Sequence, residues 1–174
     1  MSSELWYVVL IAAVVVERIT ELVVSQRNVT WALRQGGAET GRGHYPLMVA
    51  LHSGLLAACL VEVFATERPF LPVLGVTMLA LVLGAQALRW WCISVLGRRW
   101  NTRVVVIPGR SLVATGPYRW LRHPNYLAVA IEGIALPLVH TAWVTALTFT
   151  VLNAVLLLGY RIPTEERALE SAAA

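Results

Sequence analysis

The sequence contains neither lysine nor aspartate, so apart from four histidines its basic side chains are 14 arginines and its acidic ones are 10 glutamates. Charged residues make up 14% of the 174 positions, whereas hydrophobic residues make up 57%. Soluble domains carry about 45–50% apolar residues, and the mean hydropathy here is +0.65. One domain of this length could not bury so much apolar surface in water. The composition therefore excludes an ordinary soluble domain and predicts an integral membrane protein.

Cysteine is also scarce, because only Cys59 and Cys92 are present and both lie inside apolar runs. Two thiols in this setting form neither a disulfide framework nor a zinc signature, so we expect no metal site. A signal peptide is not predicted, since Glu4 rather than a basic cluster precedes the first long apolar run. No repeat or linker divides the chain, and residues 1–174 are expected to form a single domain.

The apolar runs predict an all-α integral membrane bundle, because a membrane-spanning helix needs about 20 predominantly apolar residues. The last two runs are separated by a tight turn near His140 and Thr141, so they should form an antiparallel hairpin. A polar loop separates the third run from this hairpin, and a short polar tail ends the chain. The five predicted spans cover about residues 5–24, 46–65, 70–96, 124–139 and 142–160. The resulting segments are three helices in 1–96, a loop at 97–123, the hairpin at 124–161 and a C-terminal segment at 162–174.

The arginines indicate the orientation in the membrane. They gather in segment 25–45, in loop 97–123 and in the tail, whereas the other side of the predicted bundle has only Arg68. Cytoplasmic loops are enriched in arginine and lysine, so the N-terminus is expected outside the cell and the arginine-rich loop inside it. This placement accounts for the net charge of +4, and no nucleic-acid partner is expected.

Two polar motifs flank the hairpin: GPYRWLRHPNY at residues 116–126 and RIPTEE at 161–166. Pro124 suits the first position of the fourth helix, which leaves His123 just outside it. An imidazole beside the free N–H groups of a helix start can hold a carboxylate or a ribose oxygen. Taken alone, a His-Pro pair is more simply an interfacial histidine before an ordinary helix.

Arg161 and Glu165 follow the hairpin. Their simplest interpretation is an ion pair at a helix end. Pro163 is expected to kink or restart the helix, so the two side chains need not share one helical face. In a functional interpretation Glu165 would bind a cationic ligand group and Arg161 an anionic one.

Several ionisable residues lie within predicted spans, where a charge is unfavourable and should face the bundle interior. Glu132 is the clearest case, seven residues after Asn125 and on about the same face of the fourth helix. Glu17 and Glu21 are expected to pair structurally with Arg18 or Arg89. His52 raises the same question.

With both motifs identified, the segment RSLVATGPYRWLRHPNY, the hairpin and RIPTEE together resemble the isoprenylcysteine carboxyl methyltransferase family of membrane enzymes. The resemblance covers about residues 97–170, and the segments ERITELVVSQRN and GHYPLMVALH look like the short bacterial branch, which implies a bacterial cell membrane. Residues 162–174 would then close the cofactor site. The resemblance implies S-adenosylmethionine as the methyl donor, with Arg161 facing the methyl acceptor. The donor site would be lined by Leu112, Val113, Tyr118, His123, Pro124, Asn125, Tyr126 and Glu165.

Two features depart from the family pattern. Arg110 stands where many relatives carry histidine, and the chain stops at Ala174 without the longer aromatic tail common in the family. The role of Arg110 and the closure of the pocket therefore stay open at the level of sequence.

The resemblance implies transfer of a methyl group to a carboxylate or acidic hydroxyl oxygen of a lipophilic acceptor, such as a prenylated cysteine, an alkylpyrone or a phenolic lipid. Arg161 would hold the acceptor oxygen, and Glu132 would assist deprotonation or anchor the pocket. A phospholipid N-methyltransferase is the close alternative, because such enzymes share paired glutamates. An NADPH-dependent sterol-type reductase has a similar C-terminal half but about twice as many spans, and a non-catalytic membrane interaction protein is the remaining option.

Overall fold

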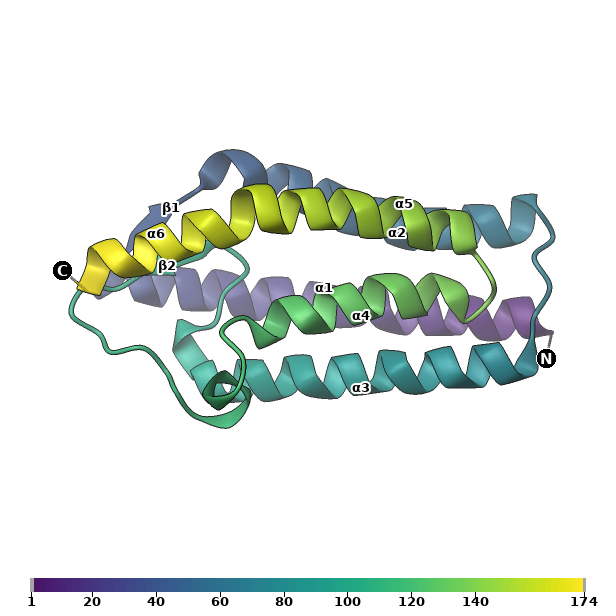
Figure 1. Ribbon diagram of the computed structural model, residues 1–174, viewed down its shortest axis with the longest axis horizontal. Helices are drawn as coiled ribbons and strands as arrows, with labels where there is room; N and C mark the ends of the chain where they lie inside the picture. The colour runs from purple at the N-terminus through teal and green to yellow at the C-terminus, as the bar shows by residue number, and fades with distance from the viewer. Residues whose placement is uncertain (1, 174) are drawn as a thin grey trace.

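The computed structural model describes residues 2–173, and it consists of long helices packed side by side (Figure 1). The N-terminus and the C-terminus lie at opposite ends of this bundle, as an odd number of passes requires. The helix α5 continues through a π-helical turn, η4, into α6, so the chain forms five helical rods and the predicted all-α class is confirmed. The helices are α1 (Ser3–Arg34), α2 (Tyr45–Ala65), α3 (Pro72–Leu96), α4 (Pro124–Leu138), α5 (Trp143–Leu156) and α6 (Ile162–Ala173), with η4 at Leu157–Arg161.

Three of the rods are long and apolar enough to cross a membrane, namely Arg42–Ala65, Pro72–Arg99 and Trp143–Ala172. They support the prediction of an integral membrane protein. The rod that contains α4 is also apolar but has only 15 residues, or about 22 Å at 1.5 Å per residue, shorter than the roughly 30 Å hydrocarbon core. The 32-residue α1 carries Glu17, Arg18 and Glu21 midway along its length. Three of the five predicted spans are therefore supported as membrane-crossing helices. The other two correspond to α1 and α4, which pack alongside these three.

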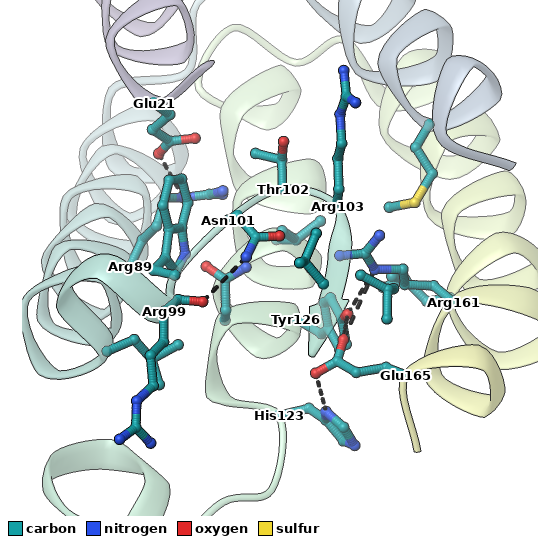
Figure 2. Close-up of a pocket in the computed structure, with 18 of the residues that line it drawn as sticks. Glu21, Arg89, Arg99, Asn101, Thr102, Arg103, His123, Tyr126, Arg161 and Glu165 are labelled. Carbon is teal, nitrogen blue, oxygen red and sulfur yellow. Dashed lines mark hydrogen bonds and ion pairs between the residues drawn. The ribbon is translucent and has the colours of Figure 1, made fainter. Parts of the chain in front are cut away.

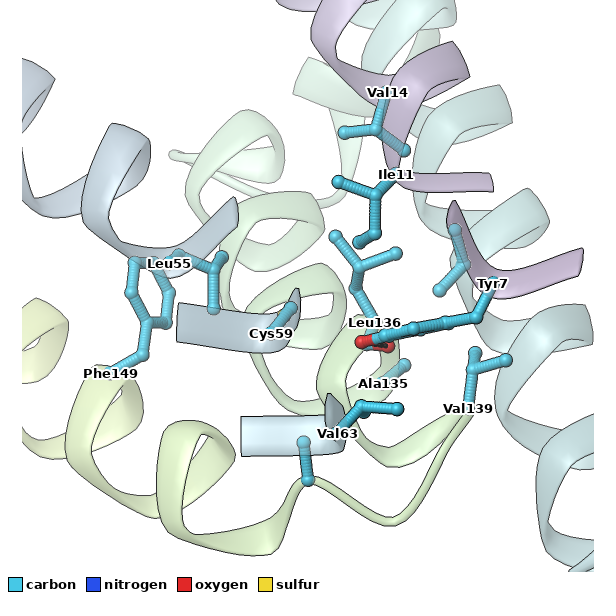
Figure 3. Packing of buried hydrophobic residues seen from close by; sticks show 12 residues of the cluster. Tyr7, Ile11, Val14, Leu55, Cys59, Val63, Ala135, Leu136, Val139 and Phe149 are labelled. Carbon is cyan, nitrogen blue, oxygen red and sulfur yellow. Dashed lines mark hydrogen bonds between the residues drawn. The ribbon is translucent and has the colours of Figure 1, made fainter. Parts of the chain in front are cut away.

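The buried core joins α1, α2, α3, α4 and α5 (Figure 3). Tyr7 of α1 is only 2% exposed, and its hydroxyl donates to the Leu136 carbonyl oxygen of α4 at 3.0 Å. Close contact between α4 and α5 depends on Gly133, because a Cβ atom there would strike the Phe149 ring. Many large apolar side chains remain exposed on the outside of the bundle, as expected for surfaces that face lipid.

The turn between α4 and α5 confirms the predicted hairpin. Thr141 has a φ of 56° there, and its hydroxyl donates to the Pro69 carbonyl oxygen at 2.6 Å. Glu62 of α2 fixes the start of α5 by accepting from the Thr145 backbone N–H at 2.7 Å and from the Thr145 hydroxyl at 2.7 Å. The hairpin is thus anchored to α2 at the end of the bundle that holds the N-terminus.

A short antiparallel ribbon was missed by the sequence analysis. Strand β1 (Ala38–Thr40) pairs with β2 (Val104–Val106), which lies in the loop predicted for residues 97–123. Each strand has only three residues, too few for an alternating pattern to stand out. The ribbon ties the α1–α2 connection to the loop after α3, so both arginine-rich segments lie at the same end of the bundle.

The kink or restart expected at Pro163 takes the form of a restart, since α5 ends at Leu156 and α6 begins at Ile162 after the π-helical turn η4, without leaving the rod. Proline removes one backbone donor and crowds the preceding turn of an α-helix. Here the wider π-helical turn at Leu157–Arg161 comes just before the proline, and such turns accommodate local strain without ending a helix. Arg161 and Glu165 therefore do share one helical face.

Candidate functional site

A cavity of about 680 Å³ lies at the end of the bundle that carries the ribbon and the C-terminus. We call it the main cavity. The RHPNY segment at the start of α4, the η4–α6 rod and the loop after α3 form its polar end, and α2, α4 and α5 supply apolar walls. All the predicted site residues line this cavity except Pro124, which is fully buried behind it.

His123 stands directly before α4, as Pro124 at the first helical position predicts. Its Nδ1 lies 3.7 Å from Glu165 Oε1, and its Nε2 lies 3.3 Å from Glu166 Oε1. The ring also stacks on Tyr126, with centroids 5.4 Å apart. The carboxylates, Glu165 first and then Glu166, raise the pKa of His123 above its ordinary value despite partial burial.

Tyr126, Arg161 and Glu165 form a second set of contacts beside the imidazole (Figure 2). The Tyr126 hydroxyl donates to Glu165 Oε2 and accepts from Arg161 Nε at 2.9 Å. Arg161 Nε is also 3.9 Å from the same carboxylate oxygen. The imidazole before α4 and the carboxylate after α5 therefore converge on one cavity.

Arg161 is only 5% exposed, and its Nε is held by Tyr126. Within residues 2–173, no hydrogen bond to its terminal Nη atoms is formed. These nitrogens can therefore hold a carboxylate or another oxyanion that enters the cavity, as guanidinium groups do with two parallel N–H donors.

Two amide oxygens are left without partners in the cavity wall. Asn125 Oδ1, in the first turn of α4, and Asn101 Oδ1, in the loop before β2, are both buried and unbonded among the described residues. A buried polar atom with no partner is unfavourable unless a ligand or water supplies a donor. Both oxygens would suit the hydroxyl or amino groups of a polar ligand.

Glu132 faces the bundle interior as predicted, with 6% exposure. It accepts from Arg18 at 2.8 Å and 2.9 Å, from Gln86 at 3.2 Å, and from Arg89 through a very short contact. The carboxylate thereby links α4 to α1 and α3 at the floor of the main cavity. A role in deprotonation stays a prediction, whereas anchoring of the pocket follows directly from these contacts.

Glu21 confirms the expected structural pairing in α1. Its Oε2 lies 2.5 Å from Arg18 Nη1, and its Oε1 lies 3.5 Å from Arg89 Nε. These two arginines are thus shared between Glu21 and Glu132. Figure 2 shows Glu21 and Arg89 across the pocket from Arg161 and Glu165.

The loop after α3 closes the rim. Leu112, which is 68% exposed, lies there with Val113, Tyr118 and Arg110. Burial raises the pKa of the Tyr118 hydroxyl. The loop is held in place by Arg99, whose Nη1 donates to the Ser111 carbonyl oxygen at 2.8 Å. Closure at the far rim comes from α6, where the Ala172 carbonyl oxygen accepts from the Gly109 N–H at 3.3 Å.

Sequence reasoning missed the contribution of residues 99–103. Asn28 of α1 holds this segment by donating to the Trp100 carbonyl oxygen at 2.6 Å, and Asn101, Thr102 and Arg103 then line the cavity. No motif marks these positions, because the contact spans 72 residues of sequence. His52 of α2 also lines the cavity, and its only signal was an imidazole in an apolar run.

Comparison with known proteins places this sequence in a family. A model described as the isoprenylcysteine carboxyl methyltransferase (ICMT) family matches residues 78–171, which contain the start of α4, the hairpin and α6. The chain belongs to the ICMT family. Family membership indicates a methyltransferase-type activity that uses S-adenosylmethionine.

Two full-length relatives extend the similarity beyond the ICMT match. The Bacillus subtilis (strain 168) protein named "Uncharacterized protein YpbQ" is 38% identical over 162 residues, which cover 92% of this chain and 95% of the relative. A Haemophilus influenzae (strain ATCC 51907 / DSM 11121 / KW20 / Rd) protein named "Uncharacterized protein" is 26% identical over 159 residues, or 91% of each chain. The similarity to both therefore includes α1 and α2, outside the ICMT match.

Proposed function

We propose that this protein is an integral membrane methyltransferase that transfers a methyl group from S-adenosylmethionine to an oxygen of a lipophilic acceptor. The observation that carries the proposal is the convergence of His123, Tyr126, Arg161 and Glu165 on one cavity. Family membership supplies the donor, and the arrangement of charges in the cavity supports an oxygen acceptor.

The cavity walls fit the methyl donor. S-adenosylmethionine would supply an electrophilic methyl group carried on a sulfonium. Glu165 and Glu166 offer carboxylates for the donor's ammonium group, and the unpartnered oxygens of Asn101 and Asn125 offer acceptors for its hydroxyl or amino hydrogens. Leu112, Val113 and Tyr118 supply apolar and aromatic surface at the rim.

Arg161 and the apolar walls of the cavity support an acceptor that combines an anionic oxygen with a hydrocarbon tail. Arg161 has terminal nitrogens free for an anionic oxygen, whereas Met48, Val129 and Phe149 line the cavity toward the membrane helices. A ligand with a carboxylate or acidic hydroxyl and a hydrocarbon tail matches both surfaces. Prenylated cysteines, alkylpyrones and phenolic lipids have this character.

Catalysis would come mainly from positioning, because displacement at a sulfonium methyl requires the acceptor oxygen in line with the breaking bond. Fixing two reactants in such a geometry can supply up to about 7–11 kcal/mol of the barrier. Arg161 orients the acceptor, Tyr126 links Arg161 to Glu165, and α6 together with the loop rim excludes water.

The arginine-rich loops lie at the same end of the bundle as the main cavity. We therefore place the site on the cytoplasmic face of a bacterial membrane, with the N-terminus outside. A soluble donor would enter from the cytosol and a lipidic acceptor from the bilayer.

A phospholipid N-methyltransferase is the second candidate, and the adjacent carboxylates of Glu165 and Glu166 favour it. An amine acceptor would gain nothing from Arg161, which is buried at the cavity with free Nη atoms. An NADPH-dependent reductase would need a nicotinamide dinucleotide to bind in the same cavity.

The proposal is tested on detergent-solubilised protein by calorimetry with S-adenosylhomocysteine and NADPH, followed by incubation of native membranes with methyl-labelled donor. We expect binding of S-adenosylhomocysteine alone and label in acidic or neutral lipids. Label in amine headgroups would favour the N-methyltransferase, and binding of neither ligand would refute an enzyme of this family type.

A further inference from the structure

His52 lies in the wall of the main cavity, yet none of the contacts described above uses it. It comes from the middle of α2, and its ring packs edge-on against Phe149 of α5, with centroids 5.3 Å apart. Its neighbours in this wall include the apolar Met48, Val49 and Leu56, and Tyr45 and Ser53 are the other polar side chains that α2 contributes. Ionisable residues at membrane depth usually have a functional reason to be there.

The hydrogen bond of the ring decides which nitrogen carries the proton. His52 Nδ1 lies 2.8 Å from the Met48 carbonyl oxygen. A carbonyl oxygen can only accept, so Nδ1 must hold the hydrogen. In the neutral imidazole, the form that predominates at neutral pH, Nε2 then carries a lone pair.

Apart from the Nδ1 contact, His52 forms no hydrogen bond within residues 2–173, so Nε2 has no partner there. The other imidazole of the cavity, His123, differs in this respect because both of its nitrogens face carboxylates. His52 is therefore the histidine of this wall that keeps a free basic nitrogen. The hydrogen bond to the Met48 carbonyl oxygen and the contact with the Phe149 ring fix the orientation of the His52 imidazole.

We propose that Nε2 of His52 is the base that accepts the proton of a hydroxyl acceptor in this cavity. This inference rests on the proposed methyltransferase function and makes it narrower. A carboxylate acceptor is already ionised at neutral pH and needs no base. A phenolic or enolic hydroxyl does need one, so the placement of His52 favours that class of acceptor.

Methylation of a hydroxyl acceptor would transfer one methyl group and one proton. The acceptor oxygen forms a bond to the methyl carbon while the carbon–sulfur bond breaks, and that electron pair remains on sulfur as a neutral thioether. The O–H proton moves to His52 Nε2, giving an imidazolium that later releases it to water.

The charged groups that act on His52 come from three other helices: Arg18 of α1, Arg89 of α3 and Glu132 of α4. From α5 the ring meets the apolar Phe149, and on its own helix it meets the Met48 carbonyl. Variants at His52 should leave the mutual pairing of Arg18, Arg89 and Glu132 in place, because none of those ion pairs includes His52.

The first test needs no methyl donor. A para-nitrophenol that carries a dodecyl chain is added to solubilised protein, and the nitrophenolate absorbance is followed against pH. We expect wild-type protein to raise the ionised fraction of the bound probe relative to empty detergent micelles, and His52→Gln to lose most of that increase. Equal ionisation in the two proteins would overturn the proposal.

The second test measures turnover on pentadecylresorcinol, a phenol, and on N-acetyl-S-farnesylcysteine, a carboxylate. His52→Gln should lower kcat on the phenol by at least about 100-fold, the scale of general base catalysis. The loss should shrink as the pH approaches about 10, where the phenol ionises unaided. A purely structural role of His52 would not restore activity at high pH.

His140→Gln provides the matched control, since His140 lies in the α4–α5 turn at the opposite end of the bundle and does not line the main cavity. We expect wild-type probe ionisation for this variant, and thermal unfolding is recorded for both. Two outcomes would overturn the hydroxyl assignment: methylation of the farnesylcysteine alone, or methylation of neither probe by protein that still binds S-adenosylhomocysteine. Neither outcome would contradict the proposed donor site. If wild-type protein did not bind S-adenosylhomocysteine, the proposed function itself would be refuted.

Discussion

The two ends of the α4–α5 hairpin carry similar residues in opposite settings. At the turn, Glu62 accepts from the Val144 and Thr145 backbone N–H groups and from the Thr145 hydroxyl, and it pairs with Arg68 at 2.9 Å. At the other end, Glu165 meets the side chains of His123 and Tyr126 in the wall of the main cavity.

The difference shows how a structural carboxylate can be told from a ligand-binding one. Backbone donors fix Glu62, and Glu62 does not line the main cavity. It is also absent from a second pocket, which lies between α2 and α5 and is lined by residues such as Leu51 and Leu152. Glu165 is held by side chains, which can rotate when a ligand arrives, and unpartnered oxygens of Asn101 and Asn125 lie in the same cavity. Four predictions test this distinction.

The largest effect is expected from Glu165→Gln. The neutral amide cannot hold a ligand ammonium, so kcat/KM for methyl transfer should fall by at least about 100-fold, the usual scale when reactants are misplaced. Steady-state assays with labelled donor measure the change. Glu62→Gln is the matched control and should keep kcat/KM near the wild-type value at a temperature where it is folded; equal losses in both variants would remove the distinction.

Glu62→Ala should act on stability instead. It leaves the Thr145 N–H and hydroxyl without a partner near the start of α5, and each buried group left unsatisfied is unfavourable by about 1–3 kcal/mol. The thermal unfolding temperature in detergent should fall clearly, while Glu165→Ala should change it much less. A larger fall for Glu165→Ala would contradict the assignment of Glu62 as the structural member.

Tyr126→Phe should have an intermediate effect on activity. The variant removes the hydroxyl that joins Arg161 to Glu165, and a hydrogen bond to a charged group contributes about 1.5–3 kcal/mol. We expect kcat/KM to fall by about 10-fold or more, with S-adenosylhomocysteine affinity changed less. Tyr45→Phe, which removes a hydroxyl that lies 3.2 Å from the Thr102 hydroxyl and does not touch Arg161 or Glu165, serves as the control.

The smallest effect is a pH dependence at His123. Its pKa is raised by Glu165 and Glu166, so the pairing is complete below the ordinary histidine pKa and is lost as the pH rises through the raised value. Hydrogen exchange of α6 amides, corrected for intrinsic rates, should therefore show stronger protection at acidic than at alkaline pH.

His123→Gln should make that protection nearly independent of pH over the same range, since the amide does not titrate. Unchanged pH dependence in this variant would assign the effect to another group. Glu62 offers the comparison at the other end, because its backbone donors do not titrate and amides near Thr145 should show no such change.

Much of the fold could be predicted from the sequence because apolar length is a local property. The predicted starts of α2 and α4 lie within one residue of the observed ones, and the turn at Thr141 was located correctly. The extension of α1 to Arg34, the ribbon and the π-helical turn before Pro163 were not predicted. They depend on pairing and on a π-helical turn, which have no sequence period of their own.

The sequence by itself determined that the chain enters a membrane, that its C-terminal half carries the motifs of the ICMT family, and that His123 and Glu165 flank one hairpin, because these follow from composition and from neighbouring residues. Only the tertiary structure decided that Arg18 and Arg89 hold Glu132, that Asn101 lines the cavity, and that Nε2 of His52 is free. Those contacts join residues far apart in sequence, and their geometry exists only once the helices have packed.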